Sequence, residues 1–177
     1  MFYVRPLSSD FIEKHIQLLQ VFDSWAGELS PHDFAEFALP PLQHIVSSFR
    51  ARLAENHLPA VPLILFAKGA NAPVSLAAAA ATGYDVLGLD WCVVPEDVRA
   101  VAPNRALQGN LDSTRLYGGR EAIESGVRQM CATFRVGGTP KGWIANLGHG
   151  ITPGVDPDAL KWFFECVHKY STRGVMP

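Results

Sequence analysis

The chain has 177 residues, 48% of them hydrophobic and 18% charged, which is enough apolar material for the core of one compact domain and too much for a disordered tail. Its net charge is −2 and no run of Lys and Arg exceeds two residues, so it lacks the basic patch of a nucleic-acid-binding protein. The 3 cysteines, an odd number in apolar surroundings, predict buried thiols in the cytoplasm, and neither a secretory signal nor a membrane-spanning stretch is expected.

Five short apolar runs are predicted to be β-strands. They lie at residues 16–22, 61–66, 86–89, 105–107 and 143–147. Each run is nearly continuous in apolar residues and ends in polar or glycine residues. That pattern is typical of parallel strands that are buried on both faces.

Helices are expected between these strands. Ser30 can cap the first helix with its hydroxyl, just ahead of a proline. The further helices are expected over 40–55, over 73–81, from 95, over 120–134 and from 156. In the last helix, Leu160, Phe163, Phe164 and Val167 are expected to form the buried stripe.

The alternation of strand and helix indicates a parallel α/β sheet with right-handed crossovers. Two architectures fit this order. A doubly wound open sheet is complete with five strands, whereas an eight-stranded barrel would be three strands short. The spacing of the elements does not distinguish between them.

Polar side chains are concentrated at the ends of the predicted strands. They are Asp23, Ser24, Lys68, Asp90, Gln108, Asn110, Asp112, Asn146 and His149. Because the carboxyl ends of parallel strands form the active-site face in both architectures, we expect a site there. The structural alternatives are helix capping for the aspartates, a turn hydroxyl for Ser24, a charge partner for Lys68, and packing for Trp25 and Trp91.

His149 is the strongest single candidate for function. It lies in a Gly-His-Gly directly after an apolar strand, whereas the other five of the 6 histidines lie in helical or loop segments. Flanking glycines let the backbone approach a ligand closely. The sequence has no phosphate-binding glycine loop, no nucleophile elbow and no residue set at zinc-ligand spacing, so we expect neither a nucleotide nor a metal.

Five segments together resemble the uroporphyrinogen decarboxylase family. In chain order they are 22–27 (FDSWAG), 66–68 (FAK), 88–91 (GLDW), 107–112 (LQGNLD) and 146–151 (NLGHGI). Their order and spacing are similar to those of the family, and the combination of the last two segments is the most specific feature. The resemblance extends from about residue 18 to about residue 171.

The resemblance implies a (β/α)8 TIM-barrel fold and an enzyme of haem biosynthesis. The complete enzyme of this family is usually a homodimer, and it uses no metal or organic cofactor. Such an enzyme removes the carboxyl groups of four acetate arms of uroporphyrinogen III to give coproporphyrinogen III. Ser24 and His149 match the family's substrate-contacting serine and histidine, and His149 is also expected to be catalytic. Both must then lie around one hollow that is large enough for a tetrapyrrole.

The resemblance covers only the C-terminal part of the family. The arginines, the aspartate and the tyrosine that contact substrate in the family have no counterpart here. We therefore expect a partial barrel of about five βα units with two unpaired edges, an uncovered face and negligible activity by itself. Residues 1–15 are expected to be a divergent N-terminal segment, and residues 16–177 the C-terminal portion of the barrel domain.

Two alternatives stay open at this point. The first is a zinc-dependent corrinoid or thiol methyltransferase of the same barrel superfamily, although Lys68 follows the strand where those enzymes commonly carry His-x-Cys. The second is a non-catalytic partial subunit that pairs with a full-length partner. The roles of Asp23, Asp90, Asn110 and Asp112 also stay open, with Asn110 and Asp112 assigned first to architecture.

Overall fold

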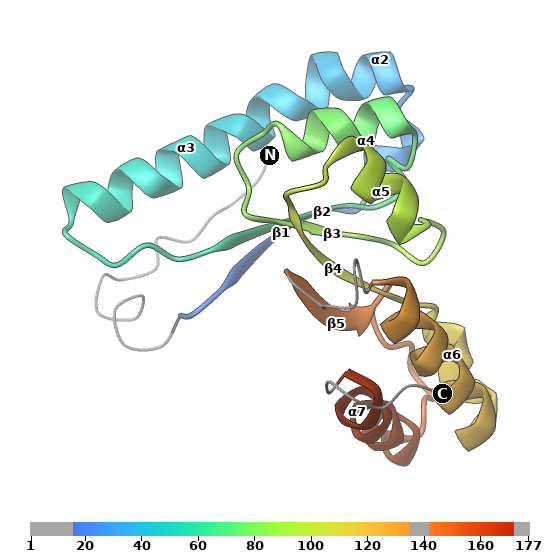
Figure 1. Ribbon diagram of the computed structural model, residues 1–177. Coiled ribbons are helices and arrows are strands. Elements are labelled where there is room, and N and C mark those ends of the chain that lie inside the picture. Colours follow the sequence, from blue (N-terminus) through green and yellow to red (C-terminus); the bar gives the residue numbers. More distant parts are fainter. Residues whose placement is uncertain (1–15, 135–141, 172–177) are drawn as a thin grey trace.

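The computed structural model describes residues 16–134 and 142–171, so the predicted segment 1–15 lies outside the described part (Figure 1). The strands are β1 (Leu19–Asp23), β2 (Leu63–Ala67), β3 (Val86–Gly88), β4 (Ala106–Leu111) and β5 (Trp143–Leu147). The helices are α2 (Pro31–Asp33), the π-helical turn η2 (Phe34–Ala38), α3 (Leu39–Glu55), α4 (Pro73–Ala80), α5 (Pro95–Val101), α6 (Gly119–Thr133) and α7 (Pro157–Ser171). Two short 3₁₀ helices are η1 (Ala26–Glu28) and η3 (Ser113–Tyr117).

The strands form one 5-stranded parallel sheet in the order β1-β2-β3-β4-β5. A doubly wound sheet reverses direction part-way through its strand order, and this sheet does not. Within the described residues, β1 and β5 each have a strand on one side only, so the sheet is not closed. The predicted partial barrel is thereby confirmed, and the open alternative of a complete doubly wound sheet is wrong.

The sheet is strongly curved. The side chain of Gln108 on β4 donates a hydrogen bond to the side chain of Gln20 on β1 over 2.9 Å. In a flat sheet these two strands would be about 14 Å apart, because neighbouring strands are spaced by about 4.8 Å. The contact therefore requires the face that carries both glutamines to be concave, as it is in a barrel.

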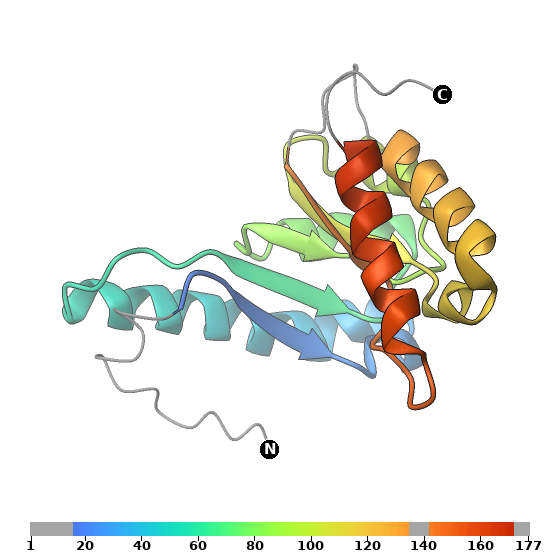
Figure 2. The same cartoon turned by 90° about the horizontal axis from the view of Figure 1, so that it is seen from below.

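The helices cover the opposite, convex face. Alternate strand residues point toward them, and the best buried members of this core include Leu107, Ile123 and Val127. Phe134 stacks on Trp143 with ring centroids 5.0 Å apart, which fixes the end of α6 against β5. Figure 2 shows α6 and α7 lying side by side along this outer layer.

The hydroxyl of Tyr84 attaches α3 to the segment that precedes β3. It donates a hydrogen bond to the carbonyl oxygen of Leu42 over 3.1 Å, and burial raises the pKa of Tyr84 to about 12. The Tyr84 hydroxyl is therefore a neutral structural donor at physiological pH.

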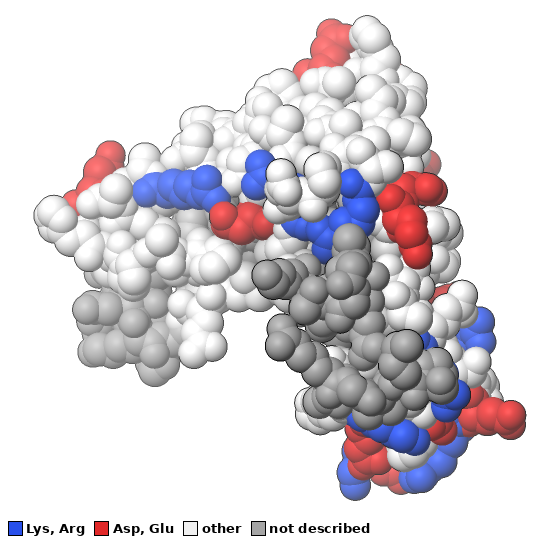
Figure 3. Space-filling view, viewed as in Figure 1, with Lys and Arg blue, Asp and Glu red and all other residues white. Residues whose placement is uncertain are grey.

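The concave face is only partly covered by described residues. In Figure 3 the molecule has an angular outline with a wide recess between the arm that carries α3 and the arm that carries α6 and α7. Lys, Arg, Asp and Glu form small mixed groups on the visible part of this view rather than one patch of a single sign. No helix in the described ranges is both long and apolar enough to cross a membrane.

Several sequence-based boundaries and burial predictions need correction. Strand β4 continues to Leu111, because residues 107–111 pair with β5, so Gln108 and Asn110 lie within the strand rather than after it. Phe164, which was expected to be buried, is 52% exposed. The buried side of α7 is formed by Phe163, Cys166 and Tyr170.

Two further predictions can be compared directly with the structure. Cys92 is exposed, contrary to the prediction, because it follows β3 in a surface turn, whereas Cys131 and Cys166 are buried. The predicted cap at Ser30 is confirmed, since its hydroxyl oxygen accepts a hydrogen bond from the backbone N–H of Asp33 over 3.1 Å.

Candidate functional site

The candidate residues lie at one end of the sheet, because all five strands run in the same direction. Ser24 follows β1 at one edge and is exposed, and His149 follows β5 at the other edge and is also exposed. Three strands separate them within the sheet. The curvature described above turns both edges toward the same concave side.

Close backbone contact joins the loops after β1 and β2. A Cβ atom added to Gly27 would lie 2.5 Å from the Cα of Gly69, so only glycine fits at this position. The N–H of Gly27 donates to the carbonyl oxygen of Lys68 over 2.8 Å, and the N–H of Lys68 donates to that of Asp23 over 3.0 Å. The loop that carries Ser24 is therefore held against the end of β2.

Asp90 connects the loops after β2 and β3. One carboxylate oxygen accepts the N–H of Gly69 at 2.8 Å, the other accepts the N–H of Cys92 at 2.9 Å, and the amide of Asn71 donates to both at 3.0 Å. Sequence reasoning considered Asp90 as a helix cap. It is not the cap of α5, which begins after Val94, since it bonds a loop 21 residues away instead.

The other two aspartates are closer to the structural expectation. Asp112 caps η3 by accepting hydrogen bonds from the backbone N–H and the hydroxyl of Thr114 at 2.9 and 2.8 Å. Asp23 accepts the backbone N–H of Trp25 at 3.3 Å in a tight turn before η1. For Lys68, the described part of the chain contains no ion pair with a carboxylate.

The ends of β4 and β5 are attached to the same group of loops. The side-chain amide of Asn110 donates to the backbone carbonyl oxygens of Asp90 and Val93 at 2.8 and 2.7 Å. The N–H of Gly148 donates to the carbonyl oxygen of Leu111 at 2.7 Å. Asn110 is thus an architectural residue, as the sequence analysis assigned it first.

The imidazole of His149 is held by two contacts and exposes its remaining nitrogen. Its Nδ1 lies 3.1 Å from the carbonyl oxygen of Gly150, which can only accept, so Nδ1 carries the hydrogen in this contact. Its ring meets the ring of Trp91 edge to face, with centroids 5.4 Å apart. Nε2 is then the nitrogen that is available to a ligand.

Exposed aromatic side chains accompany these polar groups. Trp25 is 75% exposed and Phe22 is 59% exposed, and Phe22 meets Phe66 edge to face across the concave side of β1 and β2. Large flat apolar surfaces beside a few polar groups are typical of sites for aromatic or macrocyclic ligands. Nothing in the sequence beyond the position of Trp25 and Trp91 after strands had indicated this surface.

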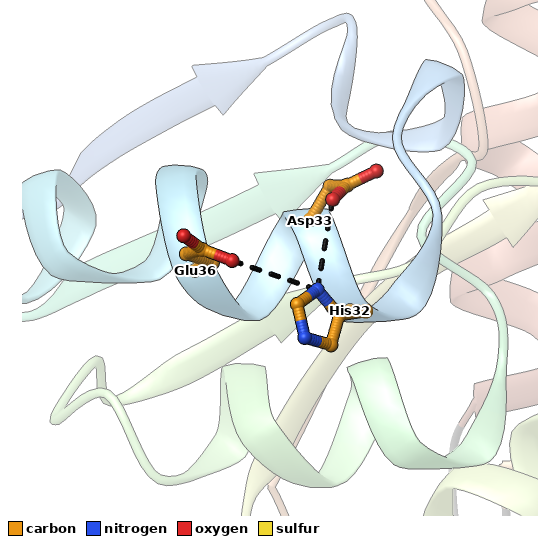
Figure 4. A group of neighbouring side chains, drawn as sticks. All are labelled: His32, Asp33 and Glu36. Carbon is orange, nitrogen blue, oxygen red and sulfur yellow. Dashed lines mark ion pairs between the residues drawn. The ribbon is translucent and has the colours of Figure 1, made fainter.

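One group of side chains has the composition of a metal site but lies elsewhere, on α2 and η2. Figure 4 shows His32 between Asp33 and Glu36, with its Nδ1 at 3.6 Å from an oxygen of each. Their ligand atoms lie within 4.8 Å of one another. All three lie in the first turns of a helix, where acidic side chains favour the helix dipole, and we assign them to that electrostatic role.

Comparison with known proteins identifies similar sequences. The family model of uroporphyrinogen decarboxylase (URO-D) matches residues 5–170. The uroporphyrinogen decarboxylase of Schizosaccharomyces pombe is 48% identical over 158 residues, which are 88% of this chain and 43% of that protein. The proteins of the same name from Homo sapiens and Myxococcus xanthus are 44% and 41% identical over 88% and 90% of this chain.

The chain spans less than half the length of the curated relatives it matches, with 43%, 41% and 42% of the three proteins covered. Among solved structures, a methyltransferase from Methanosarcina mazei superposes with a TM-score of 0.68 at 20% sequence identity. The match covers 88% of this chain and 43% of that one. At this identity the similarity concerns the fold alone.

Proposed function

Since the chain belongs to the uroporphyrinogen decarboxylase family, we propose that it forms the C-terminal wall of the substrate cleft of a uroporphyrinogen decarboxylase. The observation that carries this proposal is the site itself. His149, Ser24 and the exposed side chains of Trp25 and Trp91 lie at the carboxyl ends of the strands of a curved parallel sheet. All four residues belong to the segments that resemble the family. We infer that this end of the sheet binds one side of the tetrapyrrole.

The proposed reaction needs no external electron acceptor. A proton adds to the pyrrole carbon next to an acetate arm and makes the ring cationic. The bond between the methylene and the carboxylate then breaks, carbon dioxide leaves, and the bonding electrons neutralise the ring. A second proton reaches the methylene as the ring returns the first, so each arm becomes a methyl group with a net uptake of one proton.

In this scheme the protein has to hold a polyanionic macrocycle and stabilise changing charge. His149 is proposed to act at a carboxylate arm through Nε2, because its Nδ1 is occupied by Gly150. A protonated imidazole there neutralises carboxylate charge and can supply a proton. Ser24, exposed after β1, is proposed to donate a hydrogen bond to another arm.

The open sheet supports the proposal that this chain does not catalyse the reaction alone. Within the described residues the concave face is only partly covered and the two edges of the sheet are unpaired, so a substrate bound there stays in contact with water. Hydrogen bonds to developing charge are worth far less in water than in a closed cleft. We propose that further βα units complete the cleft, in a homodimeric, cytoplasmic enzyme that binds no nucleic acid.

A chimera tests the catalytic assignment. Residues 16–171 of this chain replace the matching part of the Schizosaccharomyces pombe relative, and the formation of coproporphyrinogen from uroporphyrinogen III is measured under anaerobic conditions. The chimera is expected to be active, and His149→Gln in it is expected to lower kcat/KM by about 100-fold or more, the usual contribution of an acid or base catalyst. The isolated 177-residue chain is expected to form no measurable product.

His168→Gln is the matched control, because His168 is an exposed histidine on α7. It should leave kcat/KM unchanged. Unchanged decarboxylation by the His149→Gln chimera would refute the role of His149. Family-like rates from the isolated chain would refute the requirement for further βα units.

A second candidate function is favoured by the two unpaired edges. Both β1 and β5 present backbone N–H and C=O groups that no described strand pairs, and such edges accept additional strands. A non-catalytic role as a partial subunit would use these edges to pair with a full-length enzyme. Size-exclusion chromatography of the chain with and without the Schizosaccharomyces pombe relative discriminates this candidate, since stable co-elution is expected only from a partial subunit.

A further inference from the structure

Asp90 is a buried carboxylate that the proposed reaction does not use. It is 4% exposed and lies two residues after the end of β3. Buried carboxylates are costly unless every oxygen is hydrogen-bonded. Both oxygens of Asp90 are satisfied, and all three donors belong to turns at the carboxyl end of the sheet, namely Gly69, Asn71 and Cys92.

These bonds reach the loop of Ser24 through one further contact. Asp90 fixes the N–H of Gly69, and the backbone of Gly69 packs directly against Gly27, where a Cβ atom would lie only 2.5 Å away. Gly27 lies three residues after Ser24, in the short helix η1 that follows the turn. A displacement of Gly69 therefore displaces the Ser24 loop, because two backbones in contact cannot interpenetrate.

Asp90 is also connected to His149, through the backbone segment that follows it. The backbone after Asp90 lies against Gly148, whose Cβ position would be 2.4 Å from the N of Trp91. The ring of Trp91 then touches the ring of His149. Asn110 adds a third attachment by donating to the carbonyl oxygen of Asp90 at 2.8 Å.

We propose that Asp90 is a positioning residue that sets the relative placement of Ser24 and His149 for binding of the tetrapyrrole carboxylate arms. It acts through Gly69 and Gly27 on one side and through Trp91 on the other, and it does not touch the substrate. The binding part of the proposal rests on the proposed function. The structural part does not.

Asp90→Asn is the main test. The variant keeps the size of the side chain, but in either orientation its NH₂ group faces the N–H of Gly69 or of Cys92, so one backbone donor loses its acceptor. In NMR spectra of the 177-residue chain, the imidazole signals of His149 and the amide signal of Gly27 are expected to shift. Affinity for uroporphyrinogen III, followed anaerobically by tryptophan fluorescence, is expected to fall about tenfold.

Asp85→Asn is a matched control at the opposite end of the same strand. Asp85 precedes β3 and accepts the N–H of Leu63 at 2.8 Å and the guanidinium of Arg50 at 2.9 Å. Replacement of the Asp85 carboxylate should shift the NMR signals of Leu63. It should leave the signals of His149 and Gly27, and the affinity for uroporphyrinogen III, unchanged. Equal shifts of His149 and Gly27 in both variants would overturn the proposal, because Asp90 would then act on general stability.

The outcomes separate the two proposals. If the chimera described above does not decarboxylate uroporphyrinogen III but Asp90→Asn shifts the signals of His149 and Gly27, the proposed function fails and the positioning role stands. If Asp90→Asn leaves these signals in place, the positioning role is overturned, whether or not the chimera is active. Should Asp90→Asn not fold, Asn71→Ala removes one donor only, and smaller shifts of the same signals are expected, while unchanged signals overturn the proposal.

Discussion

Replacement of Gly148 by alanine should open the junction between β3 and β5. Gly148 is buried beside His149, and an added Cβ would lie 2.4 Å from the N of Trp91, 2.8 Å from its Cα and 2.9 Å from the carbonyl carbon of Asp90. All three are backbone atoms, so no side-chain rotation relieves the contact. Reaching the 3.4 Å of an ordinary contact requires the two segments to separate by 1.0 Å, the difference between 3.4 and 2.4 Å.

Such a separation strains the hydrogen bond from Gly148 to Leu111 and the contact of Trp91 with His149. Forced insertion of a methyl group into a packed site costs about 1–3 kcal/mol. For a chain of this size, that corresponds to a fall in Tm of roughly 2–12 °C. Thermal unfolding followed by circular dichroism measures it, and the near-ultraviolet signal of the tryptophans reports the local change.

Gly150→Ala is the matched control on the other side of His149. A Cβ atom at Gly150 would meet nothing within 4 Å, so the substitution should change the unfolding free energy by less than about 0.5 kcal/mol. Equal Tm values for Gly148→Ala and Gly150→Ala would refute the argument. Such a result would mean that the backbone at Gly148 does not pack closely against the turn that carries Trp91.

Two further predictions concern the helical layer. Val127→Ala should lower the unfolding free energy by about 1.5–3 kcal/mol, because Val127 is 0% exposed. Val74→Ala, at a position that is 63% exposed, should change the unfolding free energy by less than about 0.5 kcal/mol. Urea titration of the two variants compares these values. Hydrogen bonds from Lys169, and then from Tyr170, lower the pKa of the Glu124 carboxyl, so its stabilising contribution is complete above the unfolded pKa of about 4.3 and is lost as the pH falls through the folded value. Unfolding between pH 3 and 6 should therefore depend less on pH in Glu124→Gln than in the parent chain, and identical profiles would contradict this assignment.

Local patterns were enough to predict the type and order of the elements. The continuous apolar runs predicted all five strands, and the hydroxyl of Ser30 predicted the start of the first helix. The end of β4 was missed because Gln108, Gly109 and Asn110 have the composition of a turn. They form a strand because β5 pairs with them and because Gln108 finds a polar partner, Gln20, across the concave face.

What the sequence did not predict depends on contacts between distant segments. Strand order is a property of pairing, so the sequence by itself allowed both an open sheet and a barrel. The hydrogen bonds of Asp90 to distant loops were missed for the same reason. Helix capping is a local signal that can be read a few residues ahead, whereas the N–H of Gly69 lies 21 residues before Asp90.

The consecutive strand order means that the backbone of every described strand pairs only with the strands immediately before and after it in the chain. The register of each pair of neighbouring strands is therefore set by segments that follow one another in the chain. Removal of an edge strand would leave the backbone pairing of the other strands in place, and would remove only contacts across the concave face such as that between Gln20 and Gln108.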